Sequence, residues 1–70
     1  KINIMKDQYH TFSNENRKAE VFLDTTTDSK GVWLVECFED EKLAKVFEGS
    51  SETWAESMSD EWVMGQISIL

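Results

Sequence analysis

The sequence predicts one small α+β domain spanning residues 1–70, an antiparallel β-meander with one helix packed on one sheet face. The meander is expected to have three central strands and short terminal strands. Two observations predict this fold. Residues 19–48 form three successive segments of strand length separated by polar turns. Residues 50–65 place Trp54, Met58 and Trp62 at i, i+4 and i+8, the spacing of one helix face.

The N-terminal part is expected to contain one short strand and a loop. Ile2 and Ile4 alternate with polar residues in residues 1–5, which predicts a strand. Residues 6–18 are polar without a clear period, so we expect a loop that Tyr9 and Phe12 anchor to the core. Within that loop, residues 14–18 are expected to be the most mobile.

Residues 19–26 predict the first central strand. Its inward face is expected to hold Ala19, Val21, Leu23 and Thr25. Phe22 falls on the outward face with Glu20 and Asp24, and an outward aromatic side chain needs cover. Residues 28–31 then form a turn in which Gly31 supplies a positive φ.

Residues 32–39 predict a central strand that is apolar on both faces. One face holds Val32, Leu34 and Phe38, and the other holds Trp33, Val35 and Cys37. Such a strand is typical of a sheet that is covered on both sides. After an acidic turn at residues 39–42, residues 43–48 predict the third strand, with Ala44 and Val46 opposite Leu43 and Phe47.

The helix begins after Gly49, and Ser50 or Ser51 is expected to cap its first free N–H groups. Glu52 then lies at the positive end of the helix dipole, and Gly65 ends the helix in left-handed geometry. Residues 66–70 alternate at Ile67 and Ile69 and predict a last short strand.

The size of the chain favours self-association. A domain of 70 residues buries only about 60% of its unfolded surface. One cysteine excludes an intramolecular disulfide, and one histidine excludes a zinc site of the usual Cys/His type. Because one helix covers one face, the other face needs the N-terminal segment or a second subunit. We favour a homodimer, with Phe22, Trp33 and Phe47 as candidate contact residues.

Charge limits the partners. Seven basic and fourteen acidic residues give a net charge of −7, which disfavours direct binding to nucleic acid or to an anionic membrane. No signal-like, transmembrane or lipidation motif is visible in the sequence. The unpaired cysteine and the absence of a glycosylation sequon lead us to expect a cytoplasmic protein.

The predicted helix also carries a set of carboxylates, namely Glu52, Glu56, Asp60 and Glu61. Two interpretations stay open. The set is a solvated face, or it binds a basic protein, either by simple docking or by mimicking nucleic acid. The stripe formed by Trp54, Met58 and Trp62 could bind a partner, but we favour its assignment as the core face of the helix.

No residue pattern predicts catalysis, and we do not expect an enzyme. Cys37 lies among apolar residues and is expected to be an inert core thiol, and His10 a solvated loop residue. The acidic turn at residues 39–41 lacks the alternating pattern of a calcium loop. A chain of this length rarely offers a pocket of several hundred cubic ångström. Accordingly we expect no catalytic residue, no cofactor and no metal.

Two segments, WLVECFEDEKLAKVFEG and SETWAESMSDEWVMGQI, carry a resemblance to a protein family. They resemble small proteins of no assigned activity that marine T4-like phages of cyanobacteria encode and that ocean metagenomes contain. The resemblance covers residues 19–68, and its main departure is Glu41, where the family has glycine. It implies a phage or marine environmental origin and no known activity, and it transfers no functional residue. We therefore expect a non-enzymatic interaction or accessory protein, in the cytoplasm of an infected host cell if a phage encodes it.

Overall fold

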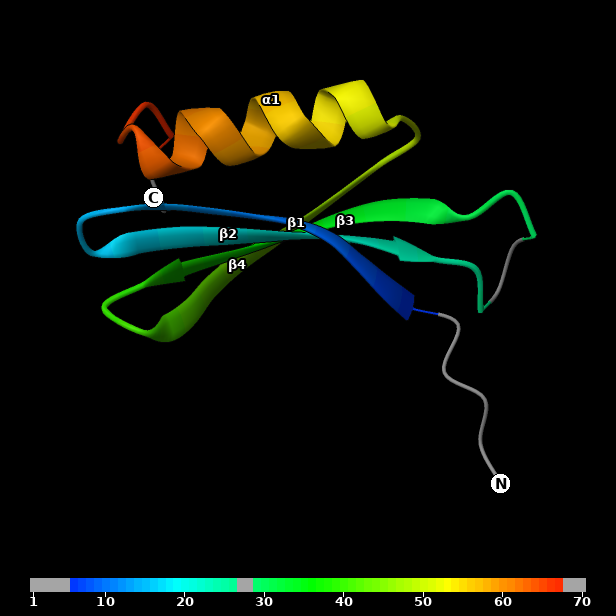
Figure 1. Cartoon of the computed structure of the whole chain (residues 1–70), viewed down its shortest axis with the longest axis horizontal. Coiled ribbons are helices and arrows are strands. Elements are labelled where there is room, and N and C mark those ends of the chain that lie inside the picture. The colour runs from blue at the N-terminus through cyan, green and yellow to red at the C-terminus, as the bar shows by residue number, and fades with distance from the viewer. Residues whose placement is uncertain (1–5, 27–28, 68–70) are drawn as a thin grey trace.

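The computed structural model describes residues 6–26 and 29–67. Four strands form one antiparallel sheet in the order β1-β2-β3-β4, and a single helix packs on it (Figure 1). The elements in chain order are β1 (Lys6–Asn14), β2 (Arg17–Asp24), β3 (Val32–Glu39), β4 (Lys42–Gly49) and α1 (Glu52–Val63). The predicted α+β meander with one helix on one face is therefore confirmed.

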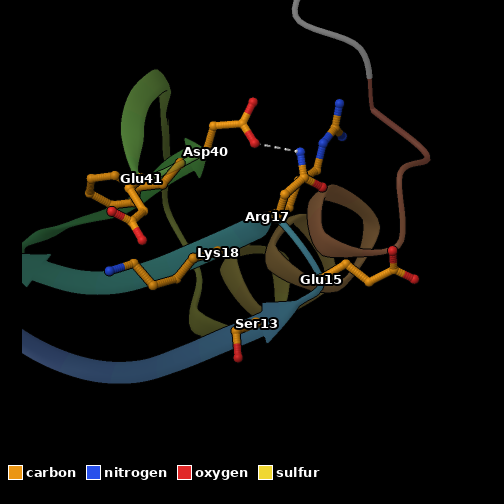
Figure 2. A pocket seen from close by; sticks show the side chains of 8 residues that line it. Ser13, Glu15, Arg17, Lys18, Asp40 and Glu41 are labelled. Atoms are coloured by element: carbon orange, nitrogen blue, oxygen red, sulfur yellow. Dashed lines mark hydrogen bonds between the residues drawn. The ribbon is translucent and has the colours of Figure 1, made fainter.

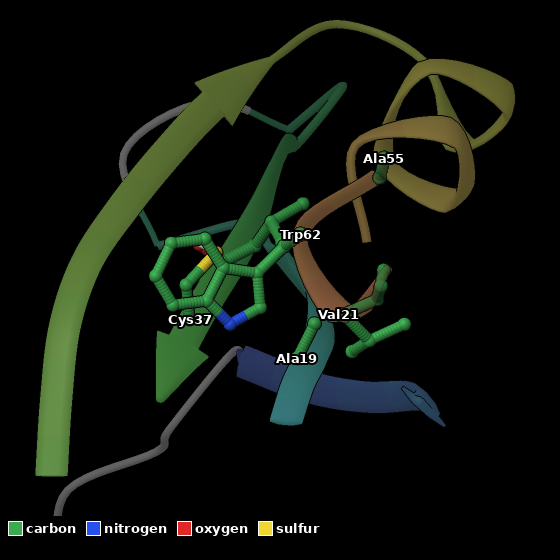
Figure 3. Packing of buried hydrophobic residues seen from close by; sticks show 7 residues of the cluster. Ala19, Val21, Cys37, Ala55 and Trp62 are labelled. Atoms are coloured by element: carbon green, nitrogen blue, oxygen red, sulfur yellow. Dashed lines mark hydrogen bonds between the residues drawn. The ribbon is translucent and has the colours of Figure 1, made fainter. Parts of the chain in front are cut away.

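The core lies between α1 and the face of the sheet that α1 covers (Figure 1). Its fully buried side chains include Val21 and Cys37 from the sheet and Ala55 and Trp62 from the helix. Figure 3 shows the Trp62 indole lying against this cluster. Trp54 and Met58 are partly buried against the same core, so the predicted aromatic stripe is the core face of the helix.

The predicted ends of the helix are also confirmed. The Ser51 hydroxyl accepts a hydrogen bond from the Trp54 N–H at 3.1 Å, which is the usual N-cap arrangement. At the other end Gly65 has a φ of +78° and its N–H donates to the Trp62 carbonyl at 3.1 Å.

Residues 6–18 do not form the predicted loop. They form β1, a two-residue turn and the start of β2, and Asn14 pairs directly with Arg17. The expected mobile segment at 14–18 is therefore a tight hairpin, which the Asn14 side chain ties to the Val63 carbonyl at 3.1 Å. An edge strand that is covered on one face needs few apolar residues, so its sequence pattern is weak.

The predicted division of the β4 side chains between the two sheet faces is wrong, because the strand contains one extra residue. Phe38 pairs with Leu43 but Cys37 pairs with Lys45, so Ala44 is an extra residue in a β-bulge. Leu43 and Val46 therefore lie on the same face of the sheet, where strict alternation would separate them.

The two ends of the chain were predicted to be strands. Residues 1–5 lie outside the described residues, and so do residues 68–70. The part of the C-terminal prediction that is described, Gln66 and Ile67, is not in a strand. Ile67 instead packs against the core.

Candidate functional site

The sheet face that points away from α1 is rich in apolar side chains, and we call it the open face. Cross-strand pairing places Phe22 beside Leu34 and Phe38 beside Leu43 on this face. Leu43 is 55% exposed and Val46 is 43% exposed. Within residues 6–26 and 29–67, no element covers this face. Its apolar residues are Phe22, Val32, Leu34, Phe38, Leu43 and Val46.

Charged residues lie among the apolar residues of the open face. Lys18 forms an ion pair with Glu20 at 3.2 Å, and its ammonium lies 4.7 Å from the centre of the Phe38 ring. Glu20 and Glu36 are directly opposite each other on neighbouring strands. The open face is thus a central apolar surface among charged side chains, which is the composition of many non-obligate interfaces.

The three predicted self-association residues do not share one surface. Phe22 lies on the open face, as expected. Trp33 and Phe47 lie on the opposite face and pack against the core, and the Trp33 ring meets Tyr9 edge-on at 4.9 Å. The alternation of side chains in β3 places Leu34 and Phe38 on one face. The bulge in β4 breaks that alternation, so the sequence does not predict that Leu43 and Val46 join them.

A hollow of about 760 Å³ lies next to the open face, where the β1–β2 and β3–β4 turns meet (Figure 2). It is larger than we expected for a chain of this length. The Asp40 N–H donates to the Asn16 carbonyl at 2.9 Å, which joins the two turns. Lys18 and Phe38 belong to both the hollow and the open face. The residues around it are Ser13, Glu15, Asn16, Arg17, Lys18, Phe38, Asp40 and Glu41.

The backbone around this hollow is in an unusual conformation. Glu15, Asp40 and Glu41 have φ values of 55°, 53° and 68°, in the left-handed region that favours glycine. In the β3–β4 turn both central residues have positive φ, as a two-residue hairpin of the I′ type requires. The predicted acidic turn at residues 39–42 is confirmed, without the glycine that would make it favourable.

The four helix carboxylates are divided between two environments. Glu52 and Glu56 lie beside His10, whose Nε2 is 3.2 Å from a Glu52 oxygen and 2.8 Å from a Glu56 oxygen. Asp60 and Glu61 are exposed one to two turns further along α1. His10 was predicted as a solvated loop residue, but it lies in β1 and faces the helix. Its partners are 42 and 46 residues away in sequence, so only the fold reveals this cluster.

Cys37 is fully buried in the core, as predicted. Burial raises the pKa of its thiol to about 11, and the Arg17 charge only partly opposes that shift. A thiol with this pKa is protonated at neutral pH, so Cys37 has no nucleophilic character.

Comparison of the chain with protein-family models, with curated proteins and with solved structures found no match. In the part of the chain that the structure describes, no helix has the length and apolar character needed to cross a membrane.

Proposed function

We propose that this chain is a non-enzymatic interaction protein that forms a homodimer through its open face. The observation that carries the proposal is the row of apolar side chains on the sheet face opposite α1, with Leu43 and Val46 about half exposed. A contiguous apolar surface of this kind marks an interaction site in a soluble protein.

A second copy of the chain is the occupant that fits the area. Four strands about 4.8 Å apart and eight residues long give a face of roughly 500 Å² in projection. Two such faces bury about 1,000 Å² in total, which is the lower limit for a specific interface. Stacking two sheets at about 10 Å with the helices outside gives each copy the second layer that its sheet lacks.

The charge of the protein sets the salt dependence of this dimer. Two copies that each carry a net charge of −7 repel each other, and salt screens that repulsion. Dimerisation should therefore strengthen as the salt concentration rises. Binding of a basic protein through the helix carboxylates has the opposite dependence, since salt weakens attraction between opposite charges.

The interface is tested by comparing two variants that introduce the same charge. Leu43→Asp changes an exposed residue of the open face, and Met64→Asp changes a residue that is 59% exposed at the end of α1. Each copy in a two-fold dimer loses the burial of one leucine, about 1.5 kcal/mol or more per copy. We expect the dimer dissociation constant of Leu43→Asp to rise about 100-fold or more, and that of Met64→Asp to stay near the wild-type value.

Sedimentation velocity over a range of concentrations measures both constants, and circular dichroism checks that the variants are folded. Equal dissociation constants for the two variants would contradict an interface on the open face. A partner that binds more weakly in high salt, and that Asp60→Lys with Glu61→Lys releases, would favour the basic-protein alternative. The cellular role that we propose for the dimer is that of an accessory protein of a phage, on the strength of the sequence resemblance.

A further inference from the structure

His10, Glu52 and Glu56 bring three potential metal ligands together at the start of α1. The nearest nitrogen of His10 and one oxygen of each glutamate lie within 4.8 Å of one another. The three side chains are 40–46% exposed, so an ion can reach them from solvent. The cluster lies on the helix side of the sheet, away from the open face, and does not depend on dimerisation.

Local structure explains why these three side chains converge. Glu52 and Glu56 are four residues apart and lie on the same side of α1. On β1 the register shifts between Gln8 and His10, so Tyr9 is the extra residue of a bulge, which re-aims the side chain that follows it. The His10 ring is then directed at the helix, and Phe12 lies edge-on to it at 6.2 Å.

A single hydrogen on His10 cannot bond well to both glutamates. Both carboxylates approach the same atom, Nε2 of His10, at 3.2 Å and 2.8 Å. Because Nε2 carries at most one hydrogen, it cannot donate a well-aligned hydrogen bond to two separate oxygens. A divalent cation placed between the three atoms would contact all of them and would balance the two negative charges.

The distances from His10 Nε2 to the two carboxylates are close to those of tetrahedral coordination. Zinc binds imidazole nitrogen and carboxylate oxygen at about 2.0–2.2 Å, which places neighbouring ligand atoms about 3.4 Å apart. The observed separations from Nε2 are 3.2 Å and 2.8 Å, which are about 0.2 Å and 0.6 Å shorter, and the two carboxylate oxygens lie within 4.8 Å of each other. One imidazole with two carboxylates suits a transition metal better than calcium or magnesium, which prefer oxygen ligands alone.

We propose that His10, Glu52 and Glu56 bind one divalent transition-metal ion, with Zn²⁺ the ion that fits best and water in the fourth position. The sequence offers no competing site with nitrogen or sulfur ligands, because His10 is the single histidine and the single cysteine, Cys37, is buried. The bound ion would fix the edge strand β1 to the first turns of α1.

Calorimetric titration of the full chain with ZnCl2 tests the site. We expect one ion per chain, and affinity at least about 10-fold lower for both His10→Ala and Glu56→Gln. Asp60→Asn is the matched control, since it removes a carboxylate from the same helix outside the cluster, and its affinity should stay within about twofold of wild type. Titration with CaCl2 should show much weaker binding.

The NMR signals of the His10 ring test the site in the wild-type protein, so the result does not depend on whether a variant folds. They should shift on addition of Zn²⁺ and not on addition of Ca²⁺. Three results would overturn the proposal: no zinc binding, equal loss of affinity in Asp60→Asn and Glu56→Gln, or unchanged His10 signals with zinc bound. The last two would mean that zinc associates with the acidic surface in general.

Discussion

Replacement of Arg17 by methionine tests how the end of α1 is held on the sheet. The guanidinium Nη1 donates to the carbonyls of Trp62 at 3.1 Å and Ile67 at 2.7 Å. Nε donates to Glu39 at 3.2 Å, and the group lies 4.0 Å from the centre of the Trp62 ring. The last turn of α1 has no basic residue of its own, so β2 supplies the positive charge there.

The size of the effect follows from these contacts. Each hydrogen bond from the charged donor is worth about 1 kcal/mol, because the side chain keeps some contact with water. The charge at the helix end and the ion pair contribute about 0.5 kcal/mol each, and the cation–π contact about 1 kcal/mol. Methionine regains about 1 kcal/mol by apolar packing. With one hydrogen bond to each of the two carbonyls, Arg17→Met should therefore lower the free energy of unfolding by about 3 kcal/mol, most of the roughly 3–5 kcal/mol available to a chain of this size.

Urea unfolding followed by tryptophan fluorescence at one protein concentration measures this loss. Lys18→Met is the matched control, because Lys18 is the next residue, lies on the other face and is 44% exposed. Its ion pair with Glu20 and its contact with Phe38 should make a difference of less than about 1 kcal/mol. If Arg17→Met lost no more stability than Lys18→Met, the contacts of Arg17 would not be what holds the end of the helix on the sheet.

Three further predictions follow from the core and the turns. The pKa of Cys37 is raised to about 11 in the folded state, so the protonated thiol favours folding. The free energy of unfolding should be constant below about pH 9 and should fall by roughly 2 kcal/mol as the pH rises to 11. Urea denaturation at several pH values should show this fall in wild type and not in Cys37→Ala. Glu41 has a φ of 68°, which glycine adopts more easily than glutamate. Glu41→Gly should therefore raise the free energy of unfolding by up to about 1 kcal/mol and the melting temperature by several degrees. An unchanged or lower melting temperature would show that the backbone at Glu41 is not strained. Gly49→Ala would place a Cβ 2.4 Å from the Trp54 ring and should reduce stability by about 1–3 kcal/mol in urea unfolding, whereas a neutral effect would show that the indole moves freely.

The elements with strong local signals were predictable from the sequence. Val21 and Val35 alternate with outward residues in β2 and β3, and the structure buries both. The N-cap at Ser51 and the positive φ of Gly31 and Gly65 follow from local chemistry as well. Such features depend on neighbours within a few residues, so tertiary contacts do not need to be known.

The remaining features depend on contacts between distant residues. The sequence of β1 is polar and lacks a clear period, so it predicts a loop. The segment is a strand because it pairs with β2. The bulge at Ala44 breaks the two-residue period, which hid the shared face of Leu43 and Val46. The link from Arg17 to Ile67 and the cluster at His10 join positions 42 or more residues apart. Sequence spacing carries no signal for any of these.

The central claim is that the open face pairs with a second copy of the chain. Light scattering on the unmodified protein at two concentrations tests it most directly, since one chain has a mass of 8.1 kDa. We predict about twice that mass at the higher concentration, and a shift toward the dimer when salt is raised. A mass of one chain at both concentrations, whatever the salt, would contradict the claim.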